Sequence, residues 1–187
     1  MLNIRLLMLL GFIARFISPV LSLVLRLRQP ELERFMRIDR LATEAYSEGQ
    51  WLKAETLARE GLALAEHYPG NWNYGNVIHN SHQVLGLIRL REGKREEAIQ
   101  MLLAAGRTPG SPQLNSFGPR MVLARELLQK GERESVLQYI ELVALFWTKK
   151  SIQFPEVGLE NERLIKQWKT DIKAGKLPRH KSWTTDI

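Results

Sequence analysis

The stretch that decides the fold runs from residue 71 to residue 119 and reads NWNYGNVIHNSHQVLGLIRLREGKREEAIQMLLAAG (71–106), followed by RTPGSPQLNSFGP (107–119). In its first part, apolar residues recur every three to four positions, which is the spacing of one helix face. The turn between the two expected helices falls at Gly93, because glycine adopts a positive φ at little cost. The residues expected on the buried faces are Leu85, Ile88, Ala98, Met101, Leu102 and Ala105.

The second part of this stretch, Gly106 to Pro119, is predicted to be a 14-residue loop. A connection of this length in a compact helical domain is more often functional than filler. Two interpretations stay open: the loop closes a groove beside His79, or it is a compact loop that replaces a missing stretch of repeat. Arg107 and Arg120 flank the loop, where they are either solvated or a clamp for a carboxylate or phosphate.

The pattern of two helices joined by a glycine turn occurs three times along the chain. The expected turn glycines are Gly49, Gly93 and Gly131, which are 44 and 38 residues apart. Residues 31–66 are expected to form two helices interrupted at residues 47–50, and residues 123–143 form a third, more degenerate pass of the pattern. These observations predict an all-α protein built from an irregular helical repeat.

The first two passes resemble the tetratricopeptide repeat (TPR). The matching residues are Gly49-Gln50-Trp51-x-x-Ala54 in the first pass and Leu85-Gly86, Gly93 and Ala98 in the second. The resemblance implies a TPR-like array of antiparallel helix pairs, whose concave face docks a peptide or protein. At a finer scale, the motifs NxGNxIH (73–79) and GxTPGSPQLxSFGP (106–119) resemble a family of small bacterial repeat proteins, which implies a fold but no particular activity.

The chain is expected to have three regions. They are a hydrophobic membrane-anchor helix (1–29), the TPR-like repeat domain (30–150) and a C-terminal capping helix with a basic tail (151–187). The capping helix is predicted over Leu159 to Ala174, because apolar residues gather on one face and Gly175 stops the helix. The residues from Lys176 to Ile187 are expected to be held loosely.

Residues 6–25 contain thirteen Leu, Ile, Val or Phe residues, in a segment about as long as a bilayer-spanning helix. On an insertion scale these residues contribute about −4 to −8 kcal/mol, and Arg15 returns about +3 kcal/mol. The polar residues of a continuous helix would form one narrow seam, which suits either a helix lying in the membrane plane or a spanning helix packed on a partner. The seam residues are Gly11, Arg15, Ser18, Ser22 and Arg26.

Membrane attachment through residues 1–28 is therefore expected. A removed signal peptide and a buried soluble helix are the alternatives, although no small-residue cleavage site follows the apolar run. If the segment spans the membrane, the arginines that follow it outnumber Arg5 before it, so the positive-inside rule places the repeat domain in the cytoplasm. These arginines are Arg26, Arg28, Arg34, Arg37 and Arg40.

Asn and His side chains are dense over residues 71–82, although both residues are indifferent helix formers. One interpretation makes them the polar floor of the concave face, with aromatic walls. The partner-binding residues predicted there are Trp72, Tyr74, Asn76, His79, Asn80, Arg107 and Arg120. A second interpretation is structural, with the same side chains capping the helix and holding the loop. A third makes His79 and His82, one helical turn apart, ligands of a metal.

Composition narrows the function. The net charge is +7. The sequence contains no cysteine, and this absence excludes disulfides and thiol catalysis. The C-terminal basic residues alternate with acidic ones, so nucleic acid is not an expected partner. No phosphate-binding loop, nucleophile elbow or paired acidic dyad occurs, so no enzymatic activity, cofactor or metal is predicted.

The sequence thus predicts a membrane-attached adaptor, assembly factor or accessory subunit that docks another protein in a membrane complex. The alternative is a cytoplasmic metal-binding protein or enzyme centred on His79 and His82, and a peripheral RNA-binding protein is a third option.

Overall fold

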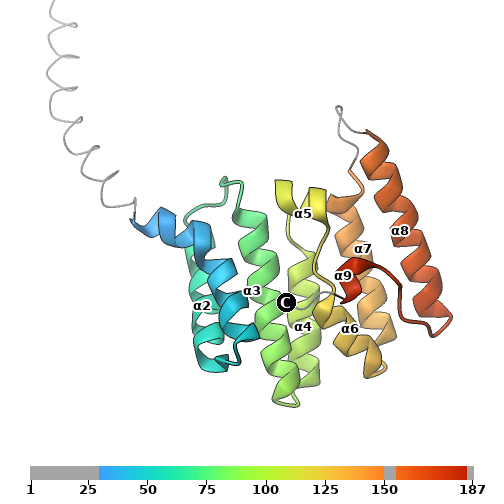
Figure 1. Ribbon diagram of the computed structural model, residues 1–187, viewed down its shortest axis with the longest axis horizontal. Coiled ribbons are helices and arrows are strands. Elements are labelled where there is room, and N and C mark those ends of the chain that lie inside the picture. The colour runs from blue at the N-terminus through green and yellow to red at the C-terminus, as the bar shows by residue number, and fades with distance from the viewer. Residues whose placement is uncertain (1–29, 150–154, 185–187) are drawn as a thin grey trace, which may run out of the picture. The chain divides into compact units, whose positions relative to one another are not determined.

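The computed structural model describes residues 30–149 and 155–184 of a chain that divides into two compact units, residues 1–36 and 37–187 (Figure 1). In the first unit the described residues, 30–36, are helical. The predicted anchor helix and all of its seam residues lie outside the described residues. Among the helices within the described ranges, none combines the length and apolar character needed to cross a membrane.

The second unit is all-α, and its described residues contain no strand, which confirms the predicted fold class. Its helical segments are residues 37–47, α2 (Trp51–Ala65), α3 (Tyr74–Arg91), α4 (Arg95–Gly106), α5 (Pro112–Phe117), α6 (Val122–Gln129), α7 (Arg133–Trp147), α8 (Pro155–Lys173) and α9 (Lys181–Thr184).

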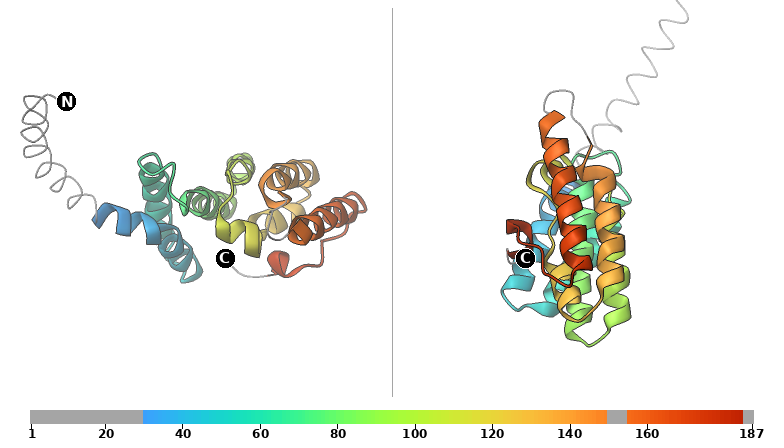
Figure 2. Two further views of the ribbon diagram at one scale, coloured as in Figure 1. Left: turned by 90° about the horizontal axis from the view of Figure 1, so that it is seen from above. Right: turned by 90° about the vertical axis from the view of Figure 1, so that its right-hand side faces the viewer.

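Helices that follow one another in the chain mostly pack side by side: α2 on α3, α3 on α4, α6 on α7, and α7 on α8. Helix α4 also packs on α7, and α9 returns to pack on α6. Seen from above in Figure 2, α2, α4 and α7 lie along one side of the row, whereas residues 37–47, α5 and α9 lie along the other. The second unit is therefore a two-layered row of helices.

The predicted turn glycines end their helices in the same way. Gly49, Gly93 and Gly131 have φ values of 75°, 77° and 93°. In each turn, the residue after the glycine donates its N–H to the carbonyl five residues earlier, as Lys94 does to Arg89 over 2.9 Å. This arrangement is a Schellman motif, and only a residue without Cβ adopts its left-handed position cheaply. The residue after the glycine is also the N-cap of the next helix, so each turn reverses the chain within two residues.

The C-terminal helices close one end of the core. Helix α8 begins at Pro155, four residues before the predicted start, because proline suits the first position of a helix, and Gly175 follows its end with a φ of 73°. The Trp168 ring stacks on Trp147 at 5.3 Å and meets Trp183 edge-on at 5.6 Å. Trp183 is fully buried, so the prediction of a loosely held tail is wrong for residues 181–184. Burial of this large aromatic ring holds α9 against the core.

Candidate functional site

Helix α3 carries a row of buried polar side chains. Asn76, His79 and Gln83 are 8%, 0% and 0% exposed. Their spacing of three and four residues places them on one helix face. Buried polar groups need hydrogen-bond partners, and all three find theirs in the segment that runs from the end of α4 to the start of α6.

His79 joins both ends of that segment to α3. Its Nδ1 lies 3.2 Å from the carbonyl oxygen of Ala105, and its Nε2 accepts the N–H of Arg120 over 3.2 Å. This pair of partners assigns the proton of the neutral ring to Nδ1. Burial lowers the pKa of His79 to about 4, and the nearby charge of Arg120 acts in the same direction. Both ring nitrogens are occupied, so His79 has none left for a metal ion.

Asn76 holds the middle of the segment. Its Oδ1 accepts the hydroxyl of Ser111 at 2.5 Å, and its Nδ2 donates to Oε1 of Gln113 at 3.1 Å. The Ser111 hydroxyl oxygen in turn accepts the N–H of Leu114 at 3.0 Å, which caps α5. One asparagine therefore connects α3 to the start of a second helix.

A backbone contact lies beside these hydrogen bonds. Thr108 donates its hydroxyl to the carbonyl of Gly75 over 2.9 Å. An ideal Cβ built on Gly75 would lie 1.9 Å from the carbonyl oxygen of Gly110, which itself has a φ of 87°. The segment thus approaches α3 so closely that position 75 has room only for hydrogen.

Gln83 completes the row near α6. Its Oε1 accepts the N–H of Leu123 at 3.3 Å, and its Nε2 donates to the Tyr139 hydroxyl at 3.3 Å. That hydroxyl donates to the carbonyl of Arg120 over 3.0 Å, and burial raises the pKa of Tyr139. We call the three α3 side chains and their partners between residues 105 and 123 the α3 clamp. These hydrogen bonds fit the structural interpretation of Asn76 and His79, in which the two side chains hold the loop.

The predicted loop differs from the structure in two respects. Residues 112–117 form the short helix α5, and α4 continues to Gly106. The signal was present in the sequence, because Ser111 is a favoured N-cap and Pro112 a favoured first helical residue.

The remaining predicted partner-binding residues lie in different surroundings. Trp72 is 50% exposed, Tyr74 is half-buried, and Arg107 is exposed at the end of α4. Asn80 donates to the Asp39 carboxylate at 2.9 Å, and Asp39 also interacts electrostatically with the half-buried Arg120. The structure thus brings Asn80 and Arg120 to one carboxylate. Burial lowers the pKa of Arg120, and Asp39 opposes this shift.

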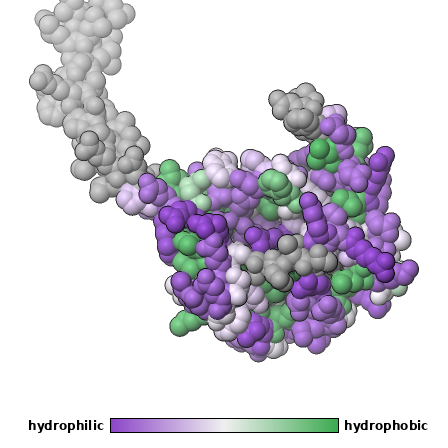
Figure 3. All heavy atoms as spheres, in the orientation of Figure 1, coloured by the Kyte–Doolittle hydropathy of each residue, from purple (hydrophilic) through white to green (hydrophobic). Residues whose placement is uncertain are grey.

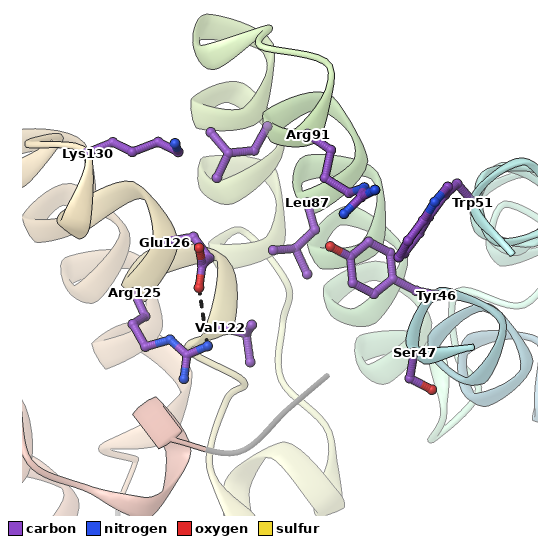
Figure 4. Close-up of a pocket in the computed structure, with 10 residues that line it drawn as sticks. Tyr46, Ser47, Trp51, Leu87, Arg91, Val122, Arg125, Glu126 and Lys130 are labelled. Atoms are coloured by element: carbon purple, nitrogen blue, oxygen red, sulfur yellow. Dashed lines mark hydrogen bonds and ion pairs between the residues drawn. The ribbon is translucent and has the colours of Figure 1, made fainter. Parts of the chain in front are cut away.

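A groove of about 500 Å³ opens between residues 46–51, α3 and α6 (Figure 4). We call it the α3–α6 groove. Tyr46 and Trp51 stand on one side, and side chains of α6 stand on the other. Its lining residues are Tyr46, Ser47, Trp51, Leu87, Leu90, Arg91, Val122, Arg125, Glu126 and Lys130.

The groove has ordered aromatic and charged parts. The Tyr46 and Trp51 rings meet edge-on at 4.9 Å, and the Arg91 guanidinium lies 3.8 Å from the centre of the Trp51 ring. Burial raises the pKa of Tyr46. The charge of Arg91 opposes this shift, and the charge of Glu126 adds to it. Glu126 is also paired with Arg125 at 3.2 Å. Charges from α3 and α6 therefore both act on the tyrosine hydroxyl.

None of the seven residues predicted to bind a partner lines this groove. A usable signal was nevertheless present in the sequence. Val122, Glu126 and Lys130 are spaced four residues apart, as are Leu87 and Arg91, so each set follows one helix face. What the sequence lacked was the information that these two faces meet.

Hydrogen bonds occupy most of the ring nitrogens that a metal site at His79 and His82 would need. His82 directs Nδ1 to the carbonyl of Ile78 on its own helix at 2.8 Å. Within the described ranges, no three or more His, Asp or Glu side chains are grouped so that they could hold a metal ion.

Fold and groove together define an all-α protein with an open, mixed apolar and basic groove. The chain matches no known family model, no curated protein and no solved structure.

Proposed function

We propose that this protein is a membrane-attached adaptor, assembly factor or accessory subunit whose TPR-like repeat domain docks another protein. The α3–α6 groove is the observation that carries the proposal. Exposed Trp51 lies beside half-buried Tyr46 and Leu90, and aromatic anchors in a groove are typical of protein-binding hot spots. The recurring Schellman turns support the resemblance to repeat proteins that bind partners on a concave face.

The chemistry of the lining favours binding over catalysis. The one carboxylate among the ten lining residues, Glu126, is paired with Arg125 at 3.2 Å. The hydroxyl of Ser47 donates to the Glu44 carbonyl of its own helix at 2.8 Å. Nucleophilic catalysis needs a base within hydrogen-bond reach of the nucleophile.

The rest of the visible surface favours a localised contact. On the face shown in Figure 3, the described residues are mostly hydrophilic, and the apolar ones form small separate patches. A partner would therefore be recognised through a defined groove rather than a broad apolar face.

Membrane attachment rests on the sequence of residues 1–28, with its apolar run and polar seam. A tether of this kind keeps the groove close to the membrane, so the docked partner is expected to belong to a membrane complex on the cytoplasmic side. Deleting residues 1–28 should move the protein from the membrane fraction to the soluble fraction.

Replacing Trp51 with alanine should release the partner. The experiment is a mild-detergent pull-down of the full-length protein from its native membranes. Loss of an aromatic hot-spot residue costs about 2 kcal/mol or more in binding, roughly a 30-fold loss of affinity. The matched control is Leu52→Ala, because Leu52 is 81% exposed and does not line the groove. Equal recovery of partners by both variants would remove the groove from the proposal.

A further inference from the structure

The charges of the α3–α6 groove are not balanced. Three cations, Arg91, Arg125 and Lys130, line it against one carboxylate, Glu126, which leaves a surplus of two positive charges. Arg125 is partly neutralised, because it pairs with Glu126 at 3.2 Å. Among the described residues, neither Arg91 nor Lys130 has a carboxylate partner. The surplus is therefore carried by these two side chains.

Several cations elsewhere in the second unit are paired with carboxylates. Arg89, the most buried of them, pairs with Glu55, with Glu92 at 2.5 Å and with Glu97 at 3.4 Å. Other examples are Arg95 with Glu132 at 3.2 Å and Lys166 with Glu162 at 2.9 Å. Among the described residues, Lys53, Arg133 and Lys173 also lack a carboxylate partner, so what sets Arg91 and Lys130 apart is that both line the same groove.

The two unpaired cations approach the groove from different helices. Arg91 ends α3 and is held over the Trp51 ring, which fixes the direction of its guanidinium. Lys130 follows α6 on the opposite side (Figure 4). The apolar residues of the lining are Leu87, Leu90 and Val122. The groove therefore combines an apolar surface with positive charge contributed from both sides.

We propose that the α3–α6 groove recognises a short acidic segment of its protein partner. An apolar side chain of the segment rests on Leu87, Leu90 and Val122, and its carboxylates face Arg91 and Lys130. Complementary charge speeds association and rejects wrong partners, and basic segments are excluded by the same surplus. This inference rests on the proposed function and adds the chemistry of the partner.

The test uses two labelled octapeptides of matched length, one repeating Asp-Leu-Glu-Leu and the other repeating Lys-Leu-Lys-Leu. Binding to the full-length protein in mild detergent is followed by fluorescence anisotropy. The acidic peptide should bind about tenfold or more tightly than the basic one. Its affinity should fall as salt is raised from about 0.05 M to about 0.5 M, because salt screens exposed charges.

The decisive variant is Lys130→Glu. It should lower the affinity for the acidic peptide about tenfold and raise the affinity for the basic peptide. Lys173→Glu makes the same charge change on α8 outside the groove and should leave both affinities within about twofold. Equal binding of the two peptides, no binding of either, or equal effects of the two variants would overturn the inference. A dimer that Lys130→Glu dissociates would also overturn it, by making a second copy the occupant.

Failure of this inference is distinguishable from failure of the proposed function. If Trp51→Ala still releases membrane partners while the acidic peptide does not bind, the groove docks a protein of other chemistry. If neither effect is seen, the docking proposal itself is lost.

Discussion

Replacing Gly75 with alanine should destabilise the protein by about 3 kcal/mol or more, a large cost for one added methyl group. The new Cβ would lie 1.9 Å from the carbonyl oxygen and 2.5 Å from the carbonyl carbon of Gly110. Both are backbone atoms, so no rotamer change relieves the overlap, and the α3 clamp must open. The melting temperature should fall by about 10 °C, measured by circular dichroism.

Gly70→Ala is the matched control for this substitution. No atom lies within 4 Å of a Cβ built on Gly70, and its φ is not positive. This variant should stay within about 0.5 kcal/mol of the wild type. An unchanged melting temperature for Gly75→Ala would contradict the close approach of α3 and the segment around Gly110.

Acidification should destabilise the wild type through His79. Its pKa is about 4 in the folded protein, below the ordinary value of 6.5, so between these values the unfolded chain binds more protons. Stability therefore rises with pH across this window and is lost as the pH falls through it. The loss should reach roughly 3 kcal/mol at about pH 4. Burial also lowers the pKa of His82, which adds a change of the same sign.

His79→Gln should be less stable at neutral pH and should lose less on acidification, as measured by urea unfolding across the window. The neutral-pH cost should be about 2–3 kcal/mol, because at least one buried partner, the Ala105 carbonyl or the Arg120 N–H, loses its hydrogen bond. Leu102→Ala is the matched control, because it truncates a fully buried side chain without removing a titrating group. It should lower stability at every pH and keep the wild-type slope. A His79→Gln curve parallel to the wild-type curve would show that His79 is not buried as a neutral ring.

The parts of the fold that follow from local chemistry could be predicted from the sequence. Gly49, Gly93 and Gly131 mark turns because each of them takes the left-handed conformation that ends its helix, which glycine adopts at little cost. Ala98 and Leu102 are buried, as their spacing predicted, while Met101 on the same helix remains half-buried. Periodicity finds a helix face, but the neighbouring helices decide how wide its buried part is.

The role of the polar residues could not be predicted in the same way. His79 meets Ala105 and Arg120, which are 26 and 41 residues away in the sequence. A dense run of Asn and His fits a groove floor as well as a set of hydrogen bonds to a distant segment. Only the packing of the α4–α6 segment against α3 decides between them.

The α3–α6 groove is hidden in the sequence for a related reason. Its lining comes from three separated segments, and Trp51 and Arg91 meet although they are 40 positions apart. Each segment alone reads as an ordinary amphipathic helix or turn. The groove exists only because two helix faces are brought together. Its surplus of positive charge is apparent only once the lining residues and their ion pairs are known.

The central claim is that the α3–α6 groove docks a protein at the membrane, and site-specific photocrosslinking tests it most directly. A photoreactive phenylalanine analogue is placed at position 47, which lines the groove and is exposed, or at position 52, which is exposed outside it. Irradiation of intact membranes should give a discrete product of higher mass from position 47 but not from position 52, and Lys130→Glu should diminish it. No product from position 47, or the same product from both positions, would contradict the claim.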